Sequence, residues 1–194
     1  MRIAAVTVAV FAVAAFTFSP ARADAAGNVN FFLGQKSLDS NDWQPLEDQP
    51  AFGAIMSFGA DDWPVQIAAD VLVTADQETV SGIEFTATTF EFDAGVRWLI
   101  YKKGKVFPYI GAGVGVIGAA AEGDYGFGNV DAGDASLGFW ADAGVFFRLG
   151  GHFNIGLDLR YSDASVDLDF GSGIVAQDVN AGGFSYGLLL GFGW

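Results

Sequence analysis

Few side chains in this sequence could carry catalytic chemistry. It contains one histidine and no cysteine, which excludes disulfides, thiolate metal sites and a cysteine nucleophile. His152 is therefore the one conventional general base. It follows Gly150 and Gly151 in a short polar stretch with no serine nearby. We predict a histidine in a turn, and we expect neither a catalytic residue nor a cofactor.

One stretch matches the G-x-G-x-x-G pattern of dinucleotide-binding sites, through Gly113, Gly115 and Gly118. That site needs a strand that ends before the motif and a helix that begins within it. Residues 106–121 are instead one apolar run with repeated glycines, and each glycine destabilises a helix by about 1 kcal/mol. We interpret the glycines as parts of a strand that line a crowded interior.

Acidic residues gather in four polar segments, residues 37–49, 75–84, 120–135 and 163–180. Carboxylates at this density could bind Ca²⁺ or Mg²⁺. However, Asp167, Asp169 and Gly171 lack the remaining ligands of an EF-hand loop. We expect these segments to be solvated loops, and we assign no metal site.

The composition is unusual for a soluble domain. Hydrophobic residues make up 52% of the 194 residues and charged residues 16%, against about 25% charged in a typical domain. This composition excludes a disordered chain. The net charge of −14 argues against a nucleic-acid partner, because such proteins carry a basic surface.

The N-terminus has the order of a secretory signal peptide. Arg2 precedes an apolar run over residues 3–18, and Ala21, Arg22 and Ala23 supply a cleavage site flanked by small residues. The alternative is a membrane anchor, but a spanning helix needs about 20 apolar residues. We predict that residues 1–23 are removed and that residues 24–194 form one domain.

The rest of the chain alternates between apolar and polar residues, which is the pattern of β-strands with two different faces. The expected strands are residues 29–35, 51–58, 65–74, 90–100, 106–119, 137–149, 153–161 and 184–194. Their connections alternate between short ones and the four long acidic segments. This layout predicts an all-β, eight-stranded antiparallel transmembrane up-and-down β-barrel.

The polar face decides between lipid and water outside the barrel, since a water-soluble barrel also alternates. That face is rich in glycine and carries a few charges of both signs, which suits a narrow lumen. Large aromatic residues of the apolar face fall at strand ends, as two membrane interfaces would require. We place Phe58, Trp98, Phe107, Phe147, Phe153 and Trp194 near the short turns, and Phe90, Phe139, Tyr161 and Phe184 near the long loops.

The lumenal charges predict a network of ion pairs. If the hairpin of residues 137–161 turns about Gly151, Asp142 lies opposite Arg160 and Arg148 lies opposite Asn154. A shift by two residues would oppose Asp142 to Asp158, and like charges in a confined lumen are costly. The expected network comprises Asp70, Glu91, Asp93, Arg97, Asp142, Arg148, Asp158 and Arg160.

Two stretches carry a resemblance to a known family, "VFPYIGAGVGV" at Val106–Val116 and "YGLLLGFGW" at Tyr186–Trp194. With them the mature chain resembles the small eight-stranded outer-membrane β-barrel proteins of Gram-negative bacteria, the OmpA/OmpX type. The resemblance implies a location in the cell outer membrane, in contact with its lipid and lipopolysaccharide. It also implies that the barrel-assembly machinery reads a C-terminal signal, here Tyr186, Leu188, Leu190, Phe192 and Trp194.

The expected function follows from the small bore of such a barrel, whose interior is just filled by side chains. We expect a structural or surface-interaction protein that presents acidic extracellular loops, has no wide pore and binds a surface ligand that the sequence does not name. A narrow channel or a conduit for a small hydrophobic ligand is the alternative. A third possibility, a lipid A-modifying enzyme, would need a serine near His152.

Overall fold

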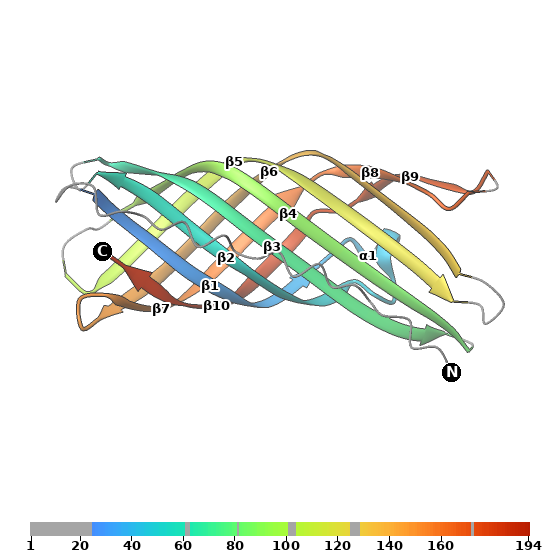
Figure 1. The fold of residues 1–194 in the computed structure, drawn as a ribbon, viewed down its shortest axis with the longest axis horizontal. Coiled ribbons are helices and arrows are strands. Elements are labelled where there is room, and N and C mark those ends of the chain that lie inside the picture. The colour runs from blue at the N-terminus through green and yellow to red at the C-terminus, as the bar shows by residue number, and fades with distance from the viewer. Residues whose placement is uncertain (1–24, 61–62, 81, 101–103, 125–128, 172) are drawn as a thin grey trace.

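A computed structural model describes residues 25–60, 63–80, 82–100, 104–124, 129–171 and 173–194. The expected signal peptide, residues 1–23, lies outside the described residues. Eight long strands close into an antiparallel barrel, in the order β1-β10-β7-β6-β5-β4-β3-β2 (Figure 1). The strands are β1 Ala25–Ser37, β2 Asp48–Ala60, β3 Val65–Val80, β4 Ile83–Leu99, β5 Val106–Asp124, β6 Asn129–Leu149, β7 Phe153–Asp163 and β10 Gly183–Gly193. The predicted eight-stranded up-and-down barrel is confirmed.

The first and last strands form the seam that closes the barrel. Strand β1 pairs with β10 from Asn28 opposite Gly193 to Ser37 opposite Phe184. Gly27 and Trp194 exchange backbone hydrogen bonds of 3.2 and 3.1 Å at the end of this seam. Figure 1 shows the C-terminus at the end where the short turns lie, which we call the short-turn end.

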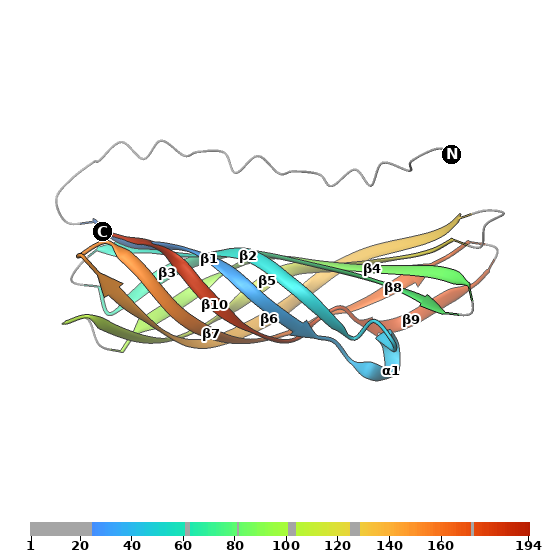
Figure 2. The ribbon, with the colours of Figure 1, turned by 90° about the horizontal axis from the view of Figure 1, so that it is seen from below.

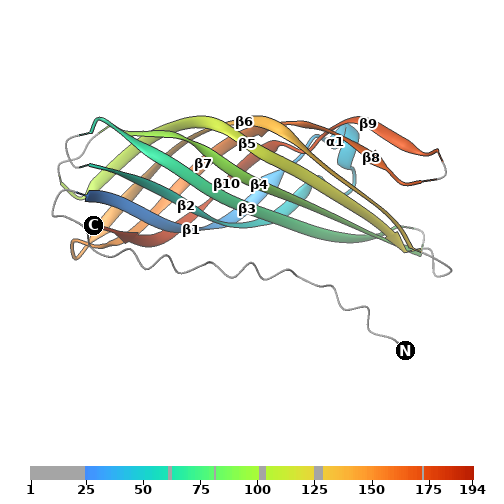
Figure 3. The same cartoon turned by 45° about the horizontal axis from the view of Figure 1, so that its top comes forward.

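Three further elements lie at the opposite, long-hairpin end. Helix α1 Ser40–Trp43 follows β1 in the sequence. Strands β8 Ser165–Asp169 and β9 Val175–Asn180 belong to the connection from β7 to β10 and form a separate two-stranded sheet. Figures 2 and 3 show all three at the same end of the barrel. None of the described helices is long and apolar enough to cross a bilayer.

Alternation along each strand separates an inner face from an outer one. In β7, the side chains of Asp158 and Arg160 are each 1% exposed, whereas Leu157, which directly precedes Asp158, is 56% exposed. The charged residues of the strand thus line the lumen and its leucines cover the outside, as the sequence pattern predicts. Large apolar side chains on the outside of the other seven strands make this surface suitable for lipid.

The strands are longer at the long-hairpin end than their apolar alternation predicts. The expected connections 75–84 and 120–135 prove to be mostly strand, since β3 pairs with β4 as far as Val80 and β5 pairs with β6 as far as Asp124. The expected loops 37–49 and 163–180 contain α1 and the β8–β9 sheet. The apolar alternation ends where the outer face leaves the hydrocarbon region of the bilayer, whereas the backbone pairing of the strands continues.

Two residues lie on the opposite face from the expected one. Phe107 is buried in the lumen, where its ring stacks on Phe146 at a centroid distance of 5.1 Å, so it is not part of an outer aromatic belt. Gly118 lies on the outer face against the ring of Phe90, while Gly113 and Gly115 point inward as expected. All three glycines lie within β5, so no dinucleotide-binding turn is formed.

Exchanging the character of neighbouring β7 residues tests the two faces. Leu157→Arg puts a guanidinium on the outer surface, which faces lipid. It should lower the free energy of unfolding of the barrel in lipid by about 2–4 kcal/mol. Asp158→Asn should cost less, because its amide oxygen can still accept a hydrogen bond in the lumen. Urea titration of the folded fraction in lipid vesicles measures both variants. Equal stability of the two would contradict the face assignment.

Candidate functional site

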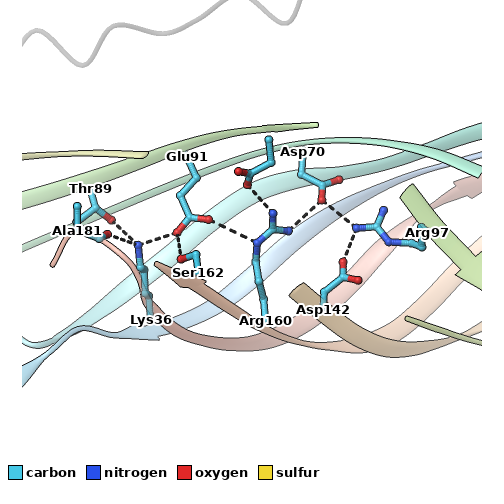
Figure 4. A network of polar contacts seen from close by, with 10 residues as sticks. Lys36, Asp70, Thr89, Glu91, Arg97, Asp142, Arg160, Ser162 and Ala181 are labelled. Carbon is cyan, nitrogen blue, oxygen red and sulfur yellow. Dashed lines mark hydrogen bonds and ion pairs between the residues drawn. The ribbon is translucent and has the colours of Figure 1, made fainter. Parts of the chain in front are cut away.

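The centre of the lumen is occupied by a group of buried charges that we call the lumenal charge network: Lys36, Asp70, Glu91, Asp93, Arg97, Asp142 and Arg160 (Figure 4). Arg160 of β7 is its most connected member. Its guanidinium lies 2.9 Å from Asp70 Oδ2, 2.5 Å from Asp93 Oδ2 and 3.5 Å from Glu91 Oε2. These carboxylates come from β3 and β4, so Arg160 bridges opposite walls of the barrel.

Arg97 of β4 joins the same network through a shared carboxylate. Its Nη2 lies 2.9 Å from Asp70 Oδ2 and also pairs with Asp142 of β6. Its Nη1 donates to the backbone oxygen of Met56 at 3.2 Å. Asp70 therefore contacts two arginines at once. Because one carboxylate cannot neutralise two cations, Asp93, Glu91 and Asp142 supply the remaining negative charge.

Lys36 is a member of the network that sequence reasoning missed. Its side chain is fully buried, and its Nζ donates to Glu91 Oε1 at 2.7 Å, to the backbone oxygen of Ala181 at 2.9 Å and to Thr89 Oγ1 at 3.3 Å. The expected first strand ended at Gln35, whereas β1 continues to Ser37. Continuing its alternation from Asn30 by even steps places Lys36 on the inner face.

Aromatic rings separate and cover the two arginines. The guanidinium of Arg160 lies 4.4 Å from the ring of Trp140, and that of Arg97 lies 5.7 Å from the same ring and 5.2 Å from Tyr109. Guanidinium groups stack favourably on such rings, particularly away from water. Gly144 leaves room for Tyr109, because a Cβ at this position would collide with the tyrosine ring.

The predicted register agrees with the structure, but the ion pairs are not all those the register suggests. Asp142 lies opposite Arg160, and Arg148 lies opposite Asn154. The carboxylate of Asp142 nevertheless pairs with Arg97 of β4, because that arginine reaches over Gly111 of β5, which lies between them in the same row. Facing positions thus bring the right charges to one level of the barrel, while side-chain length determines the partners.

Two expected members of the network form no ion pair within the part of the chain that the structure describes. Asp158 accepts a hydrogen bond from the hydroxyl of Tyr109. Arg148 donates to Asn28 and, at 3.0 Å, to Asn154 Oδ1, and it stacks on Phe107 at 4.7 Å. Arg148 lies towards the short-turn end, below the network, where polar amides and aromatic rings surround it.

The long-hairpin end of the lumen is closed by apolar side chains. Leu38, Trp43 and Leu46 from the segment that contains α1, and Val166, Leu168 and Val179 from the β8–β9 sheet, are all buried there. They pack against inner residues of β4, β5 and β6, namely Ala87, Ile117, Ala119 and Ala132. We call this group the apolar cap. It lies above Lys36, so the charges are sealed from the long-hairpin end.

The carboxylates of the long-hairpin end lie mostly at the surface, and some of them organise backbone. Asp134 Oδ2 accepts from the backbone N–H of Asp167 at 3.0 Å, and Asp167 Oδ1 accepts from that of Asp178 at 3.0 Å. The N–H groups of Asp167 and Ala135 hold the pKa of Asp134 below its usual range. Among the described residues, no three His, Cys, Asp or Glu side chains gather in a set that could hold a metal ion.

His152 lies at the other end of the molecule. It is exposed in the turn between β6 and β7, where Gly150 and Gly151 adopt φ angles of 59° and 86°. Its Nδ1 is 3.2 Å from the backbone oxygen of Gly193. These contacts describe a turn residue next to the C-terminal strand.

Removing the central cation tests whether the lumenal charge network stabilises the barrel. Arg160→Met leaves three buried carboxylates without this partner, and the loss of one partner of a buried ion pair costs about 3–5 kcal/mol. Arg148→Met is the matched control, because this arginine is half-buried and pairs with amides. Urea unfolding in vesicles should show a larger loss for Arg160→Met. Adding Asp93→Asn to Arg160→Met should recover part of it.

A loss in Arg148→Met as large as that in Arg160→Met would contradict a stabilising role of the network. So would a failure of Asp93→Asn to recover any stability, because the loss would then reflect packing alone.

Several solved structures share this fold. Among them are OprG from Pseudomonas aeruginosa (TM-score 0.63, 12% identity, over 88% of this chain and 96% of the other), Ail from Yersinia pestis in complex with the heparin analogue sucrose octasulfate (0.56, 17%, 88% and 98%) and neisserial surface protein A (0.51, 17%, 86% and 96%). No curated protein sequence matches the chain significantly. Residues 3–192 match the outer membrane protein beta-barrel domain. With this match and a closed eight-stranded barrel, the chain belongs to that family and is a protein of the cell outer membrane.

Proposed function

We propose that the protein is a non-enzymatic surface-interaction protein, whose closed barrel presents an acidic extracellular end to a positively charged partner. In outer-membrane barrels the short turns face the periplasm and the longer connections face outward. One observation carries the proposal: residues 37–49, 75–84, 120–135 and 163–180 contain 15 Asp and Glu residues and no Lys, Arg or His. These four segments make up the long-hairpin end.

The shape of that end supports the proposal. The pairing of β2 with β3 stops at Ala51 opposite Thr74, and that of β6 with β7 begins only at Phe139 opposite Asp163. Beyond these levels β3, β4, β5 and β6 stay paired with one another and project as a sheet (Figure 2). Exposed carboxylates on the sheet and on β8–β9 are Glu78, Glu84, Glu122, Asp131, Asp134, Asp167, Asp169 and Asp178.

The sign of the charge selects the class of partner. A one-sided field of carboxylates attracts cations and accelerates their association, and it repels polyanions. Ail, which shares the fold, was solved with a sulfated heparin analogue. The acidic end of this chain supports the opposite preference, for a protein or peptide surface rich in lysine and arginine.

The outward residues of β10 support the expected role in assembly. Tyr186, Leu188, Leu190, Phe192 and Trp194 all lie on the outer face of the closing strand. We infer that the assembly machinery reads this face before the seam with β1 forms, and that the same residues contact membrane lipid afterwards.

Neutralising the projecting sheet tests the proposed partner class. The full barrel in nanodiscs of zwitterionic lipid should bind a fluorescent deca-lysine peptide in a salt-dependent manner and should not bind sucrose octasulfate. Asp76→Asn, Glu78→Gln, Asp131→Asn and Asp134→Asn together should weaken binding by about tenfold, the equivalent of about 1.4 kcal/mol. Fluorescence anisotropy measures the affinity.

The matched control replaces neutral neighbours on the same hairpin, Gln77→Asn with Thr79→Ser, and should bind like the unmodified protein. Failure of the unmodified protein to bind deca-lysine, or equal affinity of the neutralised variant, would contradict the proposal.

A conductance measurement distinguishes this function from a channel. The lumen is crossed by Arg160 with its carboxylates and by the buried ring of Trp140, which leave no wide path along the axis at this level. In planar bilayers the protein should therefore give no steady single-channel steps. Reproducible steps that vanish on heat denaturation would favour the narrow channel instead.

A further inference from the structure

We propose that an apolar pocket at the extracellular end binds a small aromatic molecule that is neutral or positively charged. The pocket has a volume of about 460 Å³ and lies between the segment that contains α1, the upper parts of β4 and β5, and the β8–β9 sheet. This size is within the range of about 300–1,000 Å³ that is usual for small-molecule sites. The inference is independent of the proposed partner of the acidic surface.

The pocket walls are aromatic and aliphatic. Trp43 and Leu46 form one side, Phe85 and Ala121 line the barrel strands, and Phe170 comes from the tip of the β8–β9 sheet. Flat rings on two sides favour a flat aromatic guest, because such rings gain stacking or edge contacts in addition to burial of apolar area.

The side of the pocket formed by Trp43 is held in place before any ligand arrives. The indole Nε1 of Trp43 donates to the backbone oxygen of Asn180 at 2.7 Å, and the backbone N–H of Asn180 donates to Asp42 Oδ2 at 2.9 Å. Leu46 N donates to the backbone oxygen of Trp43 at 2.6 Å. These contacts join the α1 segment to the end of β9, so the walls need little ordering on binding.

Charge determines which aromatic molecules fit. Asp42 lies among the pocket residues and is exposed, so its carboxylate forms a polar rim, whereas the carboxylate of Glu122 lies on the other face of β5. None of the four extracellular segments supplies a lysine, arginine or histidine that could neutralise an anionic guest. An ammonium group at the rim would gain from the carboxylate of Asp42, and a carboxylate there would be repelled.

The floor of the pocket makes it a binding site and not the entrance of a passage. Ala87 lines the pocket, Ala119 and Ile117 are buried further along β5, and on β4 the next inward residues are Thr89 and Glu91, which hold Lys36. A molecule that enters from outside would therefore stop above the lumenal charge network. We infer that the site captures or senses its ligand at the cell surface.

Three probes of equal size test the proposal: 1-naphthylmethylamine, 1-naphthalenemethanol and 1-naphthoate. Calorimetric titration of the full barrel in nanodiscs, corrected for partition into empty nanodiscs, should show saturable binding of the amine and the alcohol. The carboxylate should bind at least about tenfold more weakly, since its charge faces Asp42 and finds no cation among the pocket residues. Saturable binding of the carboxylate with equal affinity would overturn the charge preference, and no saturable binding of any probe would overturn the site.

Two variants fill the pocket from opposite walls. Ala121→Phe on β5 and Ala176→Phe on β9 should each abolish binding of the amine. The matched control, Ala120→Phe, changes the neighbouring residue on the other face of β5 and should bind the amine as the unmodified protein does. Heat-dependent migration on SDS gels verifies that each variant forms the barrel. Unchanged binding in both pocket variants, with the barrel intact, would overturn the assignment.

Discussion

An eight-stranded barrel must fill its lumen with the side chains of its own strands, and in this protein charged groups fill the centre. Arg160, Arg97 and Lys36 are buried there, where each needs carboxylates within a few ångströms because water is excluded. These partners come from β3, β4 and β6. The network therefore connects β7 and β1 to β3 and β4, with which they share no backbone hydrogen bonds. The same contacts tie opposite walls of the barrel together and fill the lumen at this level with side chains.

Much of this arrangement could be predicted from the alternation of residue types. Period 2 separates Leu157 from Asp158 and places Asp142 and Arg160 on the inner face at facing positions, because strand geometry allows no other outcome. Partner choice could not be predicted from a single hairpin, since the partners lie two strands apart and meet over Gly111 of β5 or Gly144 of β6. Arg97 takes Asp142, and Asp158 meets Tyr109, through contacts that have no signature along the chain.

The limits of the strands and the apolar cap were harder to predict for a different reason. Apolar residues alternate on the outer face only across the thickness of the bilayer. This pattern therefore stops near Phe90 and Phe139, although β4 and β6 continue beyond them. Lys36 lies just beyond the expected end of the first strand, so it was not predicted as a residue of the lumen. The residues of the cap, among them Trp43, Leu168 and Val179, follow no common period because they converge from three separate segments.

The seam between β1 and β10 has a consequence for how the molecule is made. The two strands that close the barrel are the first and the last of its eight strands along the chain, so the seam joins segments that are far apart in sequence. Until β10 is in place, β1 and β7 both present unpaired backbone edges, which in other chains invite aggregation. Closure of this seam therefore does more than complete the lumen, because it removes the two backbone edges that other strands could otherwise pair with.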